Sequence, residues 1–136
     1  MNSRLLAAGV RGRMLLDQIR DPGVQDLLKK QPGLCRTSAV DDLVERQVKE
    51  EATGAEAWAP VVPQGLAVGH TSWRRWVFLQ IHVGVFGGHR LLDQTMRILG
   101  RLAWWPGMRK DVADWTDACA TCIRLRKRPT SRMRSP

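Results

Sequence analysis

Hydrophobic and polar positions along this chain recur with helical spacing in short segments that turns separate. Near the N-terminus, Asp21 is suited to cap a helix that has Pro22 at its first position. A short apolar face follows, and the sequence Gln31-Pro32-Gly33 ends it. We therefore expect a helical hairpin over residues 11–31.

The next segment, residues 39–51, is ambiguous between helix and strand. Ser38 and Asp41 have the spacing of a helix capping box, yet the apolar residues of the segment also suit a short strand. Residues 59–63 contain two prolines, each of which disfavours helix in the residue before it, so an extended segment is expected there. The glycine-bounded residues 65–69 are expected to form a loop.

Helical spacing returns after this loop and predicts three further helices. Thr71 or Ser72 caps the first, which ends near His82 and is followed by glycines that break the chain. The second covers residues 90–102 and ends at the turn Trp104-Trp105-Pro106-Gly107. The third begins at that turn and ends near a Cys-x-x-Cys sequence, after which we expect a basic tail.

The balance of charge points to a polyanionic partner. The chain has 136 residues, 43% of them hydrophobic, which suffices for one domain with a modest core. Its 22 Lys and Arg against 13 Asp and Glu give a net charge of +9. Residues 82–136 hold 11 basic and four acidic side chains, so the C-terminal half carries most of this charge. Such a surface favours nucleic acid as the partner.

Cysteine usage and hydropathy narrow the class of protein further. Three cysteines are an odd and sparse set, which argues against a disulfide framework and favours a reducing compartment. No segment approaches the roughly 18 consecutive apolar residues that a membrane span needs, so no membrane association is expected. The paired cysteines are therefore expected to bind a metal.

Two histidines and two cysteines have the spacing of zinc ligands. Six residues separate the histidines, two separate the cysteines, and two expected helices join the pairs. Because tetrahedral zinc takes four nitrogen or sulfur donors, the sequence predicts a closed structural site. The alternatives are that the Cys-x-x-Cys is a redox motif, or that the histidines lie on a helix face by chance. Cys35 and His70 are expected to be ordinary residues rather than ligands. The expected ligands are His82, His89, Cys119 and Cys122.

At these residues the sequence resembles the integrase zinc-binding domain of Gypsy-type LTR retrotransposons and retroviruses, with its His-His-Cys-Cys signature. Upstream, residues 16–22 resemble the linker that follows the ribonuclease H region of such polyproteins. Residues 40–43 resemble the short hairpin before the zinc domain, which favours strand for the ambiguous segment. Beyond the four ligands, the resemblance rests on Val62-Pro63, the aliphatic residues before His82, Gly87-Gly88-His89, Thr95, Trp105-Pro106-Gly107-Met108, Asp111-Val112 and Lys127.

The resemblance implies a mainly α fold. We expect a small zinc-stabilised three-helix bundle with helix-turn-helix character, preceded by a short β-hairpin and an N-terminal helical linker. The expected divisions are a helical linker at residues 1–36, a strand and loop extension at 37–66, the zinc-binding domain at 67–127 and a basic tail at 128–136.

The function implied is a non-catalytic, zinc-binding and nucleic-acid-binding module of a retrotransposon-type integrase, used in DNA integration. An active integrase continues into a core with three carboxylates that hold two magnesium ions, and this chain is expected to lack it because it ends at Pro136. We expect nuclear localisation, self-association and no small-molecule substrate. The alternative is a protein-interaction or oligomerisation adaptor built on a zinc-stabilised helical domain.

Basic side chains are expected to contact the DNA backbone with little sequence specificity, although the tail could equally be a solvated linker. Trp104, Trp105 and Trp115 are expected to be core residues rather than stacking platforms for bases. The tryptophans at 58, 73 and 76 are expected either to form an underside for the N-terminal segment or to make an oligomer contact. The candidate DNA contacts are Arg97, Arg101, Arg109, Lys110, Arg124, Arg126, Lys127 and Arg128.

Overall fold

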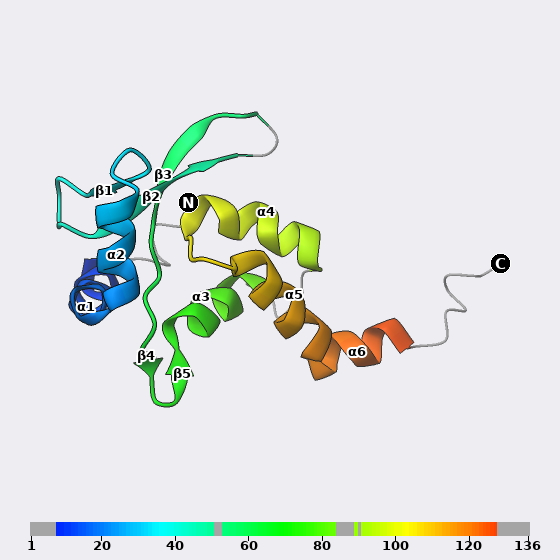
Figure 1. The fold of residues 1–136 in the computed structure, drawn as a ribbon. Coiled ribbons are helices and arrows are strands. Elements are labelled where there is room, and N and C mark those ends of the chain that lie inside the picture. Colours follow the sequence, from blue (N-terminus) through cyan, green and yellow to red (C-terminus); the bar gives the residue numbers. More distant parts are fainter. Residues whose placement is uncertain (1–7, 51–52, 84–88, 90, 128–136) are drawn as a thin grey trace.

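The computed structural model describes residues 8–50, 53–83, 89 and 91–127, with side chains in the last helix described as far as Arg124. The fold is mainly helical, with two small sheets (Figure 1). The strands are β1 (Cys35–Thr37), β2 (Val44–Lys49), β3 (Glu56–Pro60), β4 (Leu66–Val68) and β5 (Thr71–Ser72). The helices are α1 (Ala8–Arg20), α2 (Pro22–Lys30), α3 (Trp73–His82), α4 (Leu92–Leu102), α5 (Met108–Ala118) and α6 (Ala120–Lys127). None of these helices is both long and apolar enough to cross a membrane.

The expected helical hairpin near the N-terminus is confirmed. Pro22 is the first residue of α2, and the Asp21 side chain accepts a hydrogen bond from the backbone N–H of Gly23 at 2.8 Å. This cap satisfies one of the backbone donors that the first turn of a helix leaves open. The other Asp21 oxygen accepts from the N–H of Gln64 at 2.8 Å, so the cap also ties the hairpin to the chain beyond β3.

The ambiguous segment is a strand, and the short hairpin is part of a larger sheet. β2 is the central strand of a three-stranded antiparallel sheet in the order β1-β2-β3. Ser38 caps no helix, because its hydroxyl accepts from the N–H of Val40 within a turn. Cys35 lies buried on the short strand β1, opposite Arg46. A three-residue strand is too short to reveal its alternation in the sequence.

Two other expectations about loops are corrected. Residues 65–69 were expected to be a loop, but β4 and β5 form a small antiparallel hairpin over this part of the chain. The chain after Cys122 is not simply a basic tail, because α6 continues to Lys127. Both elements are short, and α6 mixes apolar and basic residues without a strong periodicity.

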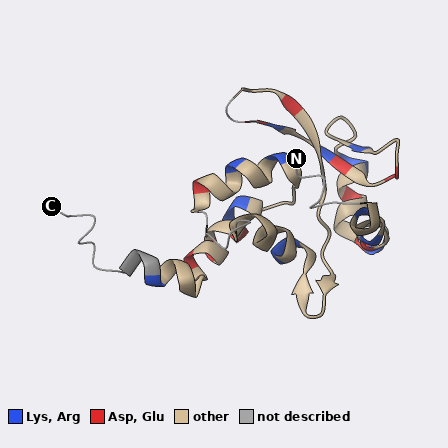
Figure 2. Cartoon of the chain, turned by 180° about the vertical axis from the view of Figure 1, so that it is seen from behind, with Lys and Arg blue, Asp and Glu red and all other residues tan. Residues whose placement is uncertain are grey.

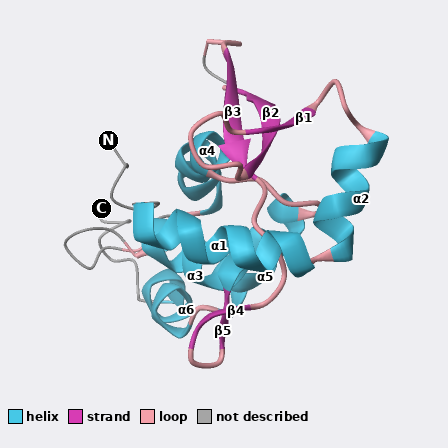
Figure 3. Ribbon diagram, turned by 90° about the vertical axis from the view of Figure 1, so that its left-hand side faces the viewer, coloured by secondary structure: helices cyan, strands magenta, loops and turns pink. Residues whose placement is uncertain are grey.

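One hydrophobic core joins the N-terminal segment to the later helices. Met14 of α1 packs with Trp73, Val77, Leu99 and Val112 of α3, α4 and α5. Figures 1 and 3 show α4 beside the three-stranded sheet, where α4 contacts β2 and β3. The backbone N–H of Trp104 also donates to the carbonyl of Pro60, which links the α4–α5 turn to the end of β3.

The tryptophans after residue 100 are core residues. Trp105 is fully buried, and Trp115 packs against the same cluster with its ring centroid 6.2 Å from that of Trp105. Trp104 is also packed, but against a second cluster that contains Val24, Val44 and Val61. None of the three is therefore a free platform for bases, as expected.

The earlier tryptophans support the N-terminal segment. Trp73 is buried and donates its indole N–H to Asp17 of α1, while the Arg13 guanidinium lies 5.4 Å from its ring centroid. Trp76 packs edge-on against Trp73 at 6.0 Å. Trp58 lies on β3 beneath the Arg36 guanidinium instead. Trp73 and Trp76 therefore form the expected hydrophobic support for the N-terminal segment, whereas Trp58 does not.

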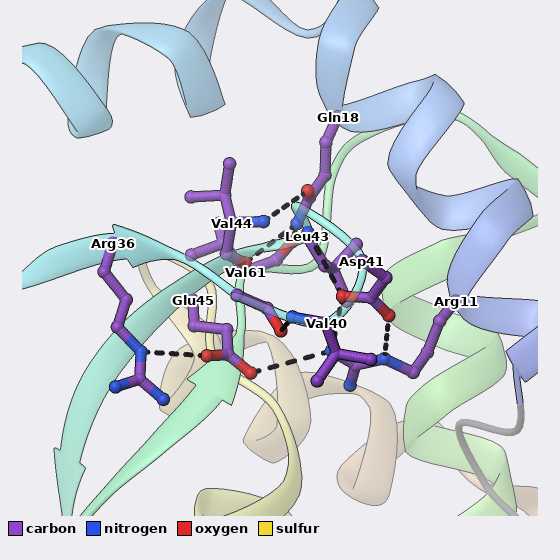
Figure 4. Close-up of polar contacts among 10 residues, drawn as sticks. Arg11, Gln18, Arg36, Val40, Asp41, Leu43, Val44, Glu45 and Val61 are labelled. Carbon is purple, nitrogen blue, oxygen red and sulfur yellow. Dashed lines mark hydrogen bonds and ion pairs between the residues drawn. The ribbon is translucent and has the colours of Figure 1, made fainter.

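Polar contacts from α1 hold the sheet in place (Figure 4). Buried Gln18 donates to the carbonyls of Val44 and Val61 and accepts from the N–H of Val44, at 2.7–3.0 Å. Its amide therefore continues the hydrogen-bonding pattern of the sheet. At the other end of the helix, Arg11 pairs with Asp41 at 2.6 Å.

The Arg11–Asp41 pair is expected to make folding sensitive to acid. The hydrogen bond from Arg11 lowers the pKa of Asp41 from 3.8 to about 2. Because the pKa is lower in the folded state, this stabilisation is complete above about pH 4 and is lost as the pH falls through about 2. Asp41→Asn is expected to lower the free energy of unfolding at pH 7 by about 1 kcal/mol, a value reduced for the solvent exposure of the pair.

Urea unfolding at pH 7, 4 and 2 would measure this effect. Asp42→Asn is the matched control, because it removes the same charge at the neighbouring position. Asp42 is exposed and has a φ of 62°, a conformation that asparagine tolerates. The destabilisation by Asp41→Asn should shrink at pH 2. An equal destabilisation by both variants, or one that does not depend on pH, would contradict this role for the pair.

Candidate metal centre

Three of the four expected ligands lie at the ends of helices, and the fourth lies in a β-bridge. His82 is the last residue of α3. Cys119 follows the end of α5 as its C-cap, and Cys122 lies in the first turn of α6. His89 is held opposite Val83 by an isolated antiparallel bridge. Glycines 87 and 88, which precede it in the signature, lie outside the described residues.

These side chains converge on one point. The four ligand atoms all lie within 4.8 Å of one another. His82 Nε2 is 3.1 Å from His89 Nδ1, and each nitrogen is 3.4 Å from one cysteine sulfur. Donors about 2.0–2.3 Å from a tetrahedral zinc ion are separated by about 3.3–3.8 Å. The cluster is therefore suited to zinc.

Packing around the cluster fixes the orientation of the buried histidine. The ring of His82 is 1% exposed and stacks on Phe78, with ring centroids 4.8 Å apart and planes at 15°. Phe78 packs in turn against Trp115 at 5.2 Å. A ring held in this way keeps Nε2 aimed at the other ligands. Such support behind the ligands is typical of metal sites.

The environment of Cys119 favours a thiolate. Burial raises the pKa of the thiol, but the pKa still lies below its ordinary value. Hydrogen bonds from the N–H groups of Cys122 and Thr121 and from the Cys122 side chain, together with the charge of Arg124, lower it. These N–H groups belong to the first turn of α6, where the helix dipole also favours negative charge. A thiolate is the form in which cysteine binds zinc.

This geometry discriminates among the interpretations of the sequence. Each cysteine faces a histidine, so a redox function for the Cys-x-x-Cys would leave both histidines unexplained. Four protein donors would fill a tetrahedral shell, which is typical of a structural site rather than a catalytic one. Cys35 on β1 and exposed His70 in the β4–β5 turn are not part of the cluster.

The candidate DNA contacts fall into two groups. Arg97, Arg101 and Arg109 line one groove together with Arg46 and Lys49 of β2, neither of which was expected from the sequence. Figure 2 shows basic positions on α4 and on the neighbouring sheet. Strand and helix are about 50 residues apart in the sequence, so a search for clusters along the chain does not join them. In the sequence, the positive charge of each residue was the only indication that it could contact DNA.

The remaining candidates lie elsewhere. Exposed Lys110 pairs with Asp114 at 2.9 Å on α5. Arg124 is exposed on α6, 3.4 Å from the Thr121 hydroxyl. The backbone of Arg126 and Lys127 belongs to α6, their side chains lie outside the described part of the chain, and so does the whole of Arg128.

Comparison with known proteins identifies one family. Residues 70–128 match the family model described as the integrase zinc binding domain. The match contains all four residues of the cluster and runs from just before α3 to the end of α6. It covers somewhat less than half of the chain, and the segment from α1 to β4 lies outside it. No solved structure matches the chain.

Proposed function

Because residues 70–128 carry an integrase zinc-binding domain, we propose that the chain is a non-catalytic module that binds one structural zinc ion and nucleic acid for DNA integration. The observation that carries the proposal is the convergence of His82, His89, Cys119 and Cys122 at one point. Zinc bound there would cross-link the end of α3 to the α5–α6 junction.

We further propose that α3, α4 and α5 form a three-helix bundle with helix-turn-helix character around this site. Leu99 of α4 is fully buried and packs in one cluster with Val77 of α3 and Val112 of α5. The turn between α4 and α5 ends at Gly107, which has a φ of 76° and precedes α5. Glycine adopts this left-handed conformation without strain.

A structural role also accounts for two of the acidic residues on α5. Asp111 accepts a hydrogen bond from the buried Trp105 indole at 2.9 Å. Asp114 pairs with Lys110. Both carboxylates thus support the helix that presents Cys119, which is consistent with a domain that positions nucleic acid and performs no chemistry on it.

The proposed partner is the DNA backbone. The net charge of +9 supports electrostatic binding, which requires no base-specific contact. Affinity for a fluorescein-labelled duplex, measured by anisotropy with zinc present, is expected to fall by about a thousandfold or more between 50 and 200 mM salt. Binding that does not depend on salt, or no binding at 50 mM salt, would contradict this function.

A protein-interaction or oligomerisation adaptor is the second candidate. Leu16 and Ile19 on α1 are 55% and 60% exposed, an apolar pair that could contact another protein or a second copy of the chain. Light scattering would report self-association. An adaptor predicts association through α1 without salt-dependent DNA binding, and a nuclear location is proposed under either function.

A further inference from the structure

A basic groove lies between the three-stranded sheet and α4. Its volume is about 380 Å³, and five positively charged side chains line it, two from β2, two from α4 and one from α5. We propose that this groove binds the phosphate backbone of nucleic acid, so that the segment before the zinc-binding domain forms one wall of the binding surface. The proposal rests on the function proposed above and assigns the binding of DNA to this groove. The five cations are Arg46, Lys49, Arg97, Arg101 and Arg109.

Two of these cations are available to a ligand. Lys49 and Arg97 are exposed and make no ion pair within the described residues. Arg97 and Arg101 are four residues apart on α4, so one helical turn separates them along the same wall. They can therefore meet successive charges of an extended polyanion.

Two other cations hold partners that a phosphate could replace. Arg101 pairs with Glu50 at 3.2 Å, and Arg109 pairs with Asp93 at 3.1 Å. Asp93 is 82% exposed, and exposed pairs of this kind contribute little stability. Phosphate oxygens would offer each guanidinium a charged and bidentate partner instead.

Arg46 is held in place before any ligand arrives. Its guanidinium lies 4.5 Å from the ring centroid of Trp104 and also donates to Gln31 and to the Gln47 carbonyl. An arginine fixed against an aromatic face loses little side-chain freedom when it binds an anion. Four of the five cations are arginines, whose planar guanidinium can donate two hydrogen bonds to the oxygens of one phosphate group.

Among the residues that the structure describes, Glu50 is the acidic one that lines the groove. Its carboxylate neutralises Arg101 and would repel a phosphate backbone at this point. Removing this charge should therefore strengthen nucleic-acid binding if the backbone occupies the groove, whereas binding elsewhere on the molecule should be almost unaffected. This contrast makes Glu50 the most informative position.

The test uses the full chain with zinc and a labelled DNA duplex. Lys49→Ala with Arg97→Ala should weaken binding on the order of tenfold or more at 50 mM salt and lower the slope of log affinity against log salt by about 2. Glu50→Gln should tighten binding roughly two- to fivefold. The control is Lys29→Ala with Lys30→Ala, which removes the same charge from exposed positions on α2.

The outcomes separate this inference from the proposed function. If the unaltered chain binds no duplex at 50 mM salt, both fail. If it binds but the two double variants weaken binding equally and Glu50→Gln has no effect, the groove assignment is overturned while the DNA-binding function stands. Displacement of the duplex by polyglutamate at equal charge concentration would overturn the preference for phosphate. Because all the altered side chains are at or near the surface, retained far-UV circular dichroism should verify that the variants fold.

Discussion

Removing the metal is expected to unfold residues 70–128, with loss of most of the helical signal of α3 to α6. Binding of zinc to small structural sites is worth roughly 10–16 kcal/mol at neutral pH, as much as the whole stability of a small domain. Here the ligands join the end of α3 to the α5–α6 junction, and His82 and Cys122 are buried at 1% and 3% exposure. Without the ion, these polar groups would lose the partner that compensates their burial.

Far-UV circular dichroism before and after addition of a chelator measures this loss. Cys122→Ser should reproduce it without chelator, because serine is a poor zinc ligand. Cys35→Ser is the matched control, since Cys35 is equally buried but lies on β1 outside the cluster. The expected result is a folded control and an unfolded Cys122 variant. Helical content that survives both the chelator and Cys122→Ser would contradict a structural role for the metal.

Gln18→Leu is expected to destabilise the chain by about 3–5 kcal/mol. The substitution removes three hydrogen bonds. It leaves the Val61 carbonyl and the Val44 N–H without the Gln18 partner, while the Val44 carbonyl keeps the hydrogen bond from the N–H of Val61. Each such group costs about 1–3 kcal/mol when it stays unsatisfied. Because α1 shares its core with α3, this loss should lower the stability of the zinc-binding helices as well.

Urea unfolding at saturating zinc, followed by tryptophan fluorescence, measures the change. The control is Gln25→Leu, which removes a single part-buried hydrogen bond to the Gln18 carbonyl and should cost no more than about 1 kcal/mol. One shared transition for sheet and helices is expected. A Gln18→Leu variant within 1 kcal/mol of the unaltered chain would show that the bridge from α1 to the sheet is dispensable.

Helices whose ends carry a local chemical signal were predictable from the sequence. Asp21-Pro22 marks the start of α2, and Ser72 caps α3 by accepting from the N–H of Arg75 at 3.2 Å. The turn that ends α4 was predictable for the same reason, because proline and glycine interrupt the helical pattern there. Capping and breaking depend on residues close together in the chain, so they can be recognised without the fold.

Elements that depend on distant partners could not be predicted in the same way. β1 and β5 have three and two residues, and such strands form only because a neighbouring strand pairs with them. The role of Gln18 was equally hidden, because its partners are 26 and 43 residues away. A polar residue on a helix is ordinarily taken to face solvent.

The same distinction applies to the two candidate sites. The metal cluster was predictable because cysteine and histidine at this spacing carry specific chemistry wherever the chain folds. The groove was only half predictable, since the arginines of α4 were proposed but Arg46 and Lys49 on β2 were not. Positive charge is common on surfaces, and its meaning depends on which residues the fold brings together.

Zinc content of the purified chain, measured by elemental mass spectrometry, tests the central claim most directly. We predict one zinc ion per chain, retained in Cys35→Ser and lost in Cys122→Ser. Absence of zinc from the folded chain, or the same zinc content in both variants, would show that His82, His89, Cys119 and Cys122 do not form the metal site.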